Sequence, residues 1–275
     1  MSIVAKFGGS ILKDDRAYED VALELLVLKA RHGKVYAVVS AQYGETQRLM
    51  HEIAGNEREA LETALLGQTI NSKFDIPKVS KTLIQGELDS VDRLIEILGD
   101  YAVGVKQTES YPIIARGSYL YGHLLLPESR LKAKELQHSA PIEIISGFGA
   151  LDINGNVVLL GRNASDYIAA IYACLYYANK IIFYKDVGGI YDKNRRKLEV
   201  ITRQEFLNLG NLQVLDPRVL DIYGGEVIVK GLYDLGNVHI TFPSITRQSN
   251  LIISGESSIR IPESGTIIKG LPEPI

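Results

Sequence analysis

Short apolar runs alternate with longer amphipathic segments along most of this chain. Residues 3–7, 34–40 and 180–184 are rich in aliphatic side chains, and each run predicts a buried strand. Residues 14–31 carry apolar side chains at helical spacing, which predicts a helix between the first two strands. Strands and helices in alternation predict an α/β fold with a mainly parallel sheet covered on both faces.

Further elements follow from the same patterns. Helical spacing extends to about residue 98, with an interruption at residues 75–77, and apolar runs follow at 111–115 and 142–146. We find no long linker or internal repeat. The sequence therefore predicts two lobes that share one sheet and divide near residue 178.

Turn and cap signals refine these boundaries. Asn154 and Gly155 lie between two apolar runs and predict a β-hairpin. Ser165 and Asp166 precede a long apolar run and are expected to cap its helix. Residues 202–205 match a capping box at the start of another helix.

Composition excludes several classes of function. The chain has 275 residues, 46% of them hydrophobic and 23% charged, and a net charge of −3, which provides no basic field for nucleic acid. Cys174 is the single cysteine, so an intrachain disulfide is excluded. The longest apolar run, residues 168–178, is too short to span a bilayer, and the N-terminus lacks the pattern of a secretion signal. We expect a cytoplasmic protein that binds neither nucleic acid nor membrane.

The stretch VAKFGGS, residues 4–10, places a lysine in a strand and then two glycines and a serine. One interpretation is a strand with an edge lysine and an ordinary turn. The other is a phosphate cradle, in which the amides of Gly8, Gly9 and Ser10 approach an anion and Lys6 adds positive charge. Ligands gather beyond the carboxyl ends of strands in open α/β sheets, so such turns are candidate binding segments.

Several well-known motifs are missing from the sequence. There is no P-loop, no G-x-G-x-x-G after the first strand, no G-x-S-x-G elbow and no H-E-x-x-H helix. The five histidines show no paired metal spacing. We therefore expect no protein-bound metal site and disfavour hydrolases.

Six segments appear in an order typical of one family. They are KFGGS at 6–10, SAQYGET at 40–46, GELDS at 86–90, GRNASD at 161–166, DVGGIYDKNRR at 186–196 and VLDPRVL at 214–220. In these segments the chain resembles the catalytic domain of the aspartokinases, which are members of the amino acid kinase family.

The resemblance implies a three-layer αβα sandwich with an amino acid kinase-like fold. It implies transfer of the ATP γ-phosphate to the side-chain carboxylate of L-aspartate, with Mg²⁺ carried by ATP, as a step of amino-acid biosynthesis. The acceptor would bind to the N-terminal lobe, residues 1–178, and the nucleotide to the C-terminal lobe, residues 179–275. The resemblance also implies a homodimer. Aspartokinases continue into regulatory ACT domains, which we expect this chain to lack.

The resemblance also assigns residues to the two sites. Lys6 would stabilise the transferring phosphoryl group, and Asp166 would orient the lysine. The implied acceptor site consists of Ser40, Thr46, Glu87, Arg162 and Ser165. The implied nucleotide site consists of Lys6, Gly8, Gly9, Ser10, Lys185, Asp186, Tyr191, Arg196 and Gln213.

Within the acceptor site, Glu87 would meet the amino group of the acceptor and Arg162 a carboxylate. Taken without the family, Glu87 is typical of a solvated helix residue and Arg162 of a surface arginine. Tyr191 is likewise typical of a tyrosine packed between lobes.

The chain departs from the family pattern near the acceptor. Aspartokinases read G-R-G-G-S-D, whereas Asn163 and Ala164 replace the two glycines here. If either position requires a positive φ, asparagine tolerates it better than alanine. Their Cβ atoms could also narrow the acceptor pocket.

A second departure changes the charges around the nucleotide. Lys185 replaces a threonine, and Gln213 replaces a lysine expected near ATP, whose charge Lys185, Lys193 or Lys230 could restore. Residues 216–218 lack the usual histidine. Two alternatives follow: a related kinase for a different small acid or phosphate acceptor, and a non-catalytic subunit that binds ATP or an amino acid.

Overall fold

A computed structural model describes most of the chain. The described residues are 2–66, 73–104, 124–125, 140–152, 154–161, 164–208, 214–233, 238–241, 252–254 and 258–260. Of the expected elements, the run at 111–115 lies outside them.

The main sheet has eight strands in the order β3-β5-β2-β1-β8-β10-β11-β9. Its strands are β1 (Ser2–Phe7), β2 (Lys34–Val39), β3 (Ala102–Gly104), β5 (Ile142–Ser146), β8 (Lys180–Tyr184), β9 (Val200–Thr202), β10 (Glu226–Lys230) and β11 (Val238–Thr241). The six strands from β3 to β10 are parallel, and β11 is antiparallel to β10. The predicted α/β class with a mainly parallel sheet is confirmed.

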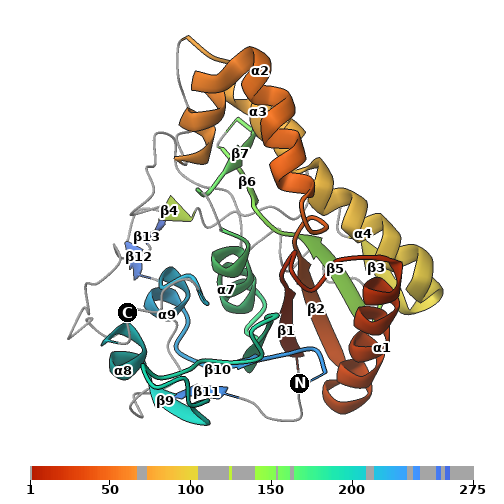
Figure 1. Cartoon of the computed structure of the whole chain (residues 1–275), viewed down its shortest axis with the longest axis vertical. Coiled ribbons are helices and arrows are strands. Elements are labelled where there is room, and N and C mark those ends of the chain that lie inside the picture. The colour runs from red at the N-terminus through yellow and green to blue at the C-terminus, as the bar shows by residue number, and fades with distance from the viewer. Residues whose placement is uncertain are drawn as a thin grey trace.

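Helices cover both faces of this sheet (Figure 1). The helices are α1 (Asp15–His32), α2 (Glu45–Leu65), α3 (Ile76–Leu83), α4 (Gln85–Leu98), α7 (Ser165–Leu175), α8 (Arg203–Asn208) and α9 (Arg218–Ile222), with a 3₁₀ turn at Gly99–Tyr101. Helices α1 and α4 share one apolar cluster with alternate residues of the strands, and α7 and α9 share the other. This alternation follows from the twofold side-chain period of a strand.

The remaining strands are short. They are β4 (Leu124–Leu125), β6 (Gly149–Leu151), β7 (Val157–Leu159), β12 (Ile252–Ser254) and β13 (Ser258–Arg260). The pair β6 and β7 forms the hairpin predicted around Asn154 and Gly155. In Figure 1, α2, α3 and this hairpin lie beyond the carboxyl ends of β1, β2 and β5.

Of the predicted helix caps, one is confirmed and one is wrong. The capping box is confirmed, because Glu205 accepts from the backbone N–H of Thr202 at 2.8 Å and the Thr202 hydroxyl accepts from that of Glu205 at 3.2 Å. The caps predicted at Ser165 and Asp166 are wrong. Helix α7 begins at Ser165, its N-cap is Ala164, and no side chain caps it. The Asp166 carboxylate is engaged by two lysines instead.

The sheet runs without a break past residue 178, since β1 pairs with both β2 and β8. The division into lobes at 178 remains a prediction. Among the described residues, no helix is both long and apolar enough to cross a membrane.

Candidate active site

Lys6 and Asp166 form a buried ion pair at the carboxyl end of β1. Lys6 alternates with Phe7, so its side chain lies on the sheet face covered by α7, where Val4 also packs. Its Nζ lies 2.8 Å from Asp166 Oδ1, and each residue is 5% exposed. Asp166 lies in the first turn of α7, where the helix dipole favours a negative charge.

A second lysine reaches the same carboxylate. Strand β8 lies beside β1, with Phe7 opposite Tyr184, so the residue after β8 is placed next to the end of β1. That residue is Lys185, whose Nζ donates to Asp166 Oδ2 at 2.7 Å. The backbone N–H of Asp216 donates to the same oxygen at 3.3 Å.

The pKa values follow from these contacts. Burial alone would raise the pKa of Asp166, but the ammonium groups of Lys6 and Lys185 outweigh it and lower the pKa to about 2. Burial lowers the pKa of Lys185, as does repulsion by Lys6, against the attraction of Asp166 and Asp216. Two ammonium groups and one carboxylate leave one positive charge in excess, which favours binding of an anion.

The glycine turn follows directly after β1. Gly8 lies beneath the lysine, since a Cβ there would stand 3.5 Å from Lys6 Nζ. A Cβ on Gly9 would stand 2.8 Å from the carbonyl oxygen of Ala41, so any larger residue would clash with backbone. Ser40 N–H donates to the Phe7 carbonyl at 3.1 Å. The turns after β1 and β2 therefore pack against each other at the sheet edge.

Glu87 is buried beside these turns. It lies in the first turn of α4 and is 2% exposed, and its Oε2 has no hydrogen-bond partner among the described residues. Burial raises its pKa to about 8, against a backbone hydrogen bond from Ala41 and the charge of Lys6. The alternative of a solvated helix residue is therefore wrong. A buried carboxylate with an open oxygen is suited to a cationic ligand.

The expected hydroxyl residues also lie at this edge. Ser165 is buried against the turn after β5, because a Cβ on Gly147 would stand 2.8 Å from its Cβ. Gly147 N–H in turn donates to the Val39 carbonyl at 2.8 Å, which brings this turn next to half-buried Ser40. Thr46 is half-buried in the first turn of α2.

Lys6, Lys185 and Asp166 form what we call the lysine cluster. The remaining nucleotide candidates are not part of it. Asp186 and Arg196 are exposed, and neither makes a side-chain hydrogen bond to the cluster within the part of the chain that the structure describes. Tyr191 is half-buried and forms an isolated bridge with Lys197. Ser10 is half-buried in the glycine turn.

The acceptor candidate Arg162 and the nucleotide candidate Gln213 lie outside the described residues, as does Asn163. Ala164 is fully buried and has a φ of −68°, so it does not need the positive φ that would strain an alanine.

No role was expected for Asp216 or Arg218, although both lie in the segment 214–220. The spacing was the available signal, because an arginine two residues after an aspartate can fold back onto its carboxylate. In the structure Arg218 binds Asp216 through both its Nε and Nη2 atoms.

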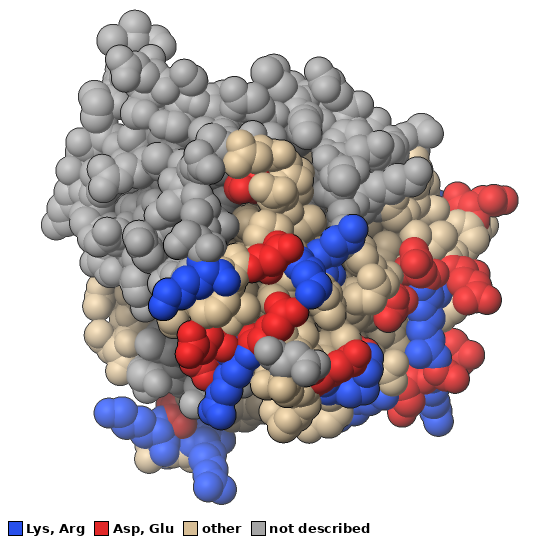
Figure 2. Space-filling model, turned by 90° about the horizontal axis from the view of Figure 1, so that it is seen from above, with Lys and Arg blue, Asp and Glu red and all other residues tan. Residues whose placement is uncertain are grey.

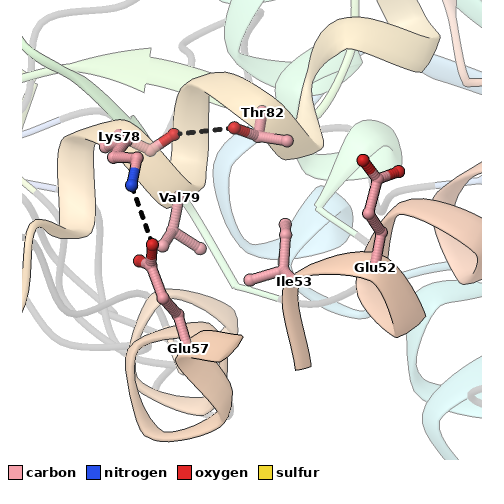
Figure 3. Close-up of a pocket in the computed structure, with 6 residues that line it drawn as sticks. All are labelled: Glu52, Ile53, Glu57, Lys78, Val79 and Thr82. Atoms are coloured by element: carbon pink, nitrogen blue, oxygen red, sulfur yellow. Dashed lines mark hydrogen bonds and ion pairs between the residues drawn. The ribbon is translucent and has the colours of Figure 1, made fainter. Parts of the chain in front are cut away.

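A separate hollow lies between α2 and α3 (Figure 3). It encloses about 170 Å³ and is lined by Glu52, Ile53, Glu57, Lys78, Val79 and Thr82. Lys78 Nζ donates to Glu57 at 2.8 Å across it. No residue of the lysine cluster lines this hollow, so we do not assign it to the active site.

Exposed charges mix both signs. Helix α2 carries the ion pairs Arg48–Glu45, Arg48–Glu52 and Arg58–Glu62. In the described part of the face in Figure 2, blue and red side chains are likewise interspersed. At the carboxyl end of β1, in contrast, two lysines share one buried carboxylate in an α/β fold, an arrangement that is suited to an anionic ligand.

Comparison with known proteins identifies the family. Residues 1–229 match the amino acid kinase family, and the chain belongs to that family. The chain is 26% identical over 266 residues to an aspartokinase of Bacillus sp. strain MGA3. That alignment covers 92% of this chain and 61% of the relative, so the chain spans about three fifths of the relative's length.

Solved structures show the same fold. The aspartate kinase from Synechocystis superposes with a TM-score of 0.68 at 21% identity, covering 90% of this chain and 41% of that one. E. coli aspartokinase III in complex with aspartate and ADP superposes with a TM-score of 0.66 at 19% identity, covering 89% and 66%. The predicted amino acid kinase-like fold is confirmed.

Proposed function

We propose that this chain is an ATP-dependent kinase that phosphorylates the side-chain carboxylate of L-aspartate, giving 4-phospho-L-aspartate and ADP. The observation that carries the proposal is the pair of lysines on one buried carboxylate, Asp166, beside a glycine turn. The names of the aspartokinase relatives support the acceptor.

Transfer to a carboxylate brings two anions together, so the site must supply positive charge and N–H donors. In the proposed mechanism Lys6 contacts the transferring phosphoryl group, and the amides of Gly8, Gly9 and Ser10 donate to phosphate oxygens. Lys185 contributes the second ammonium group. Asp166 holds both lysines in position and is itself too acidic to accept a proton near neutral pH.

The acceptor would be held by its two charged groups. The open Oε2 of Glu87 would accept from the ammonium of aspartate, and Arg162 would bind a carboxylate. Ser40, Thr46 and Ser165 would supply neutral hydrogen bonds. The side-chain carboxylate of aspartate then attacks the γ-phosphorus in line, the bond from the γ-phosphorus to the β,γ-bridging oxygen breaks, and ADP leaves.

Mg²⁺ would arrive with ATP and neutralise part of the triphosphate charge. The described residues contain no group of three or more His, Cys, Asp or Glu side chains placed to hold a metal. In line with the family resemblance, we propose that Mg²⁺ would be carried by the ATP phosphates. Asp186, Tyr191, Arg196 and Gln213 remain proposed contacts of the nucleotide.

The placement of Lys185 bears on the non-catalytic alternative. Gln213 removes one expected charge, but Lys185 Nζ lies 2.7 Å from Asp166 and restores a second ammonium group to the site. A working kinase is therefore the better supported proposal. The division into an acceptor lobe and a nucleotide lobe and the homodimer rest on the family resemblance, and the cytoplasmic location stays a prediction from the sequence.

The test is a coupled ADP-release assay with L-aspartate, in which hydroxylamine traps the acyl phosphate as a hydroxamate. We expect ADP and hydroxamate in equal amounts. Glutamate, N-acetylglutamate, carbamate and uridylate serve as competing acceptors in parallel reactions. Turnover with one of these and none with aspartate would overturn the proposed acceptor, and ATP binding without any turnover would overturn the kinase.

A further inference from the structure

The turn before α9 lies across the lysine cluster and is held there by one arginine. The backbone N–H of Asp216 donates to Asp166 Oδ2 at 3.3 Å. Arg218 Nε lies 3.0 Å from both carboxylate oxygens of Asp216, and Nη2 donates to Oδ2 at 2.6 Å. The backbone N–H of Arg218 also donates to Asp216 Oδ1 at 3.0 Å.

Arg218 is itself anchored on two other segments. Its Nη1 donates to the carbonyl of Leu160, just after β7, at 2.8 Å. Its guanidinium carbon lies 4.5 Å from the ring centroid of Tyr167, the residue after Asp166. Arg218 is 8% exposed. The planar guanidinium group of Arg218 therefore contacts the end of β7, the first turn of α7 and the turn before α9.

The pair also governs the charge beside the phosphate site. Asp216 is close enough to Lys185 to raise the pKa of that lysine, against the dominant lowering effect of burial. A carboxylate without a partner at this place would compete with phosphate for Lys185 and would repel a triphosphate. Arg218 offsets that charge with a bidentate ion pair.

We infer that Arg218 is a positioning residue for nucleotide phosphate binding. It holds the Asp216 amide on Asp166 and neutralises the Asp216 carboxylate, so that Lys185 remains available to a phosphate oxygen. The inference rests on the proposed ATP site. The acceptor plays no part in it.

The experiment measures the Kd of a non-hydrolysable ATP analogue with Mg²⁺ by calorimetry for the full chain and three variants. R218M leaves the Asp216 charge without its partner, and we expect binding to weaken about tenfold or more. D216N removes the charge and keeps the backbone amide, and we expect binding to tighten severalfold. D216N/R218M removes both charges, and we expect it to recover most of the affinity lost in R218M.

A purely structural role gives a different pattern, because the double variant would then bind as weakly as R218M and D216N would also weaken binding. Either result would overturn the inference. D216N alone decides the matter if R218M fails to fold, since tightening supports the role and weakening opposes it.

Arg203, the first residue of α8, provides a matched control because its side chain binds to α9. Its Nη2 donates to Asp221 Oδ1 at 2.5 Å and its Nε to the Leu220 carbonyl at 3.1 Å. R203M removes a comparably buried arginine that contacts α9 from α8, and it leaves the Asp216–Arg218 pair beside the lysine cluster unchanged. We expect it to lower the melting temperature and leave the Kd of the analogue unchanged.

The outcomes separate this inference from the proposed function. A wild-type chain that binds the analogue but makes no acyl phosphate would overturn the aspartate kinase, while the affinities still test Arg218. Equal affinity in R218M and the wild type would overturn the role of Arg218 and leave the kinase standing. A wild-type chain that does not bind the analogue would overturn both.

Discussion

Two lysine–carboxylate sites with buried carboxylates lie at opposite ends of the same sheet, and they differ in charge balance. At the amino ends of β2 and β5, Lys34 pairs with Glu143 and also donates to the Ala140 carbonyl at 2.5 Å. At the carboxyl ends of β1 and β8, two lysines share the single carboxylate of Asp166. The first set of charges balances, and the second retains one positive charge.

This difference indicates which of the two sites is suited to binding an anionic ligand. A one-to-one pair balances its two charges and links two neighbouring strands, as far as a buried ion pair stabilises at all. A two-to-one arrangement is incomplete until an anion arrives, and at the carboxyl edge of a parallel sheet a ligand can reach it. Variants of the two sites should therefore fail in different ways.

The largest effect is expected from Lys6→Ala. Because it removes the ammonium proposed to contact the transferring phosphoryl group, turnover with ATP and aspartate should fall a hundredfold or more, on the order typical for loss of one transition-state charge. The coupled ADP assay measures this loss, and circular dichroism should show an intact fold. Activity near that of the wild type would remove Lys6 from the mechanism.

Lys34→Met should produce the opposite signature. It leaves the fully buried Glu143 without its lysine, so the free energy of unfolding should drop by about 3–5 kcal/mol. Urea denaturation measures the drop, and turnover per folded molecule should be retained. Lys81→Ala, at an exposed position on α3, is the control and should change neither quantity. A loss of turnover without a loss of stability in Lys34→Met would break the contrast between the sites.

Lys185→Met sharpens the comparison within the charged site. It converts the two-to-one arrangement into a one-to-one pair, so the affinity for ATP should fall about tenfold or more, as for one charge-assisted hydrogen bond. The KM for aspartate should change less than the KM for ATP. Lys185→Thr, which has the residue usual in aspartokinases, should lose a similar factor. Unchanged ATP affinity in both variants would show that Lys6 alone provides the charge.

The smallest effect concerns pH and Glu87. Its pKa of about 8 means that the empty site is mostly protonated at pH 7, whereas an ammonium ligand requires the carboxylate. The KM for aspartate should therefore fall about fivefold between pH 7 and 8. Glu87→Gln should raise that KM and abolish this dependence. A wild-type KM that does not change over this range would contradict the role of Glu87.

The same group affects stability with a defined sign. The folded pKa of Glu87 is raised above its unfolded value, so its contribution to stability is complete below the unfolded pKa of 4.5. The contribution is lost as pH rises through about 8. Between pH 5 and 8 the melting temperature of the wild type should thus fall more than that of Glu87→Gln.

Local signals predicted much of the fold. Strands β1, β2 and β8 and helix α1 lie within one or two residues of their expected positions, because aliphatic runs and helical spacing are properties of the segment itself. The capping box at Thr202 was found for the same reason. The cap at Ser165 and Asp166 was mispredicted, since a distant pair of lysines, invisible in the local sequence, engages the Asp166 carboxylate.

By itself, the sequence determined the order of elements, the position of Lys6 at the end of a strand and the family segments that suggested a kinase. Only the tertiary structure decided that Lys185 stands beside Lys6, that Glu87 is buried with an open oxygen and that Arg218 holds the Asp216 amide on Asp166. The physical reason is that strand order and burial depend on contacts between distant residues. The pairing of β8 with β1 brings together two lysines that no local pattern connects.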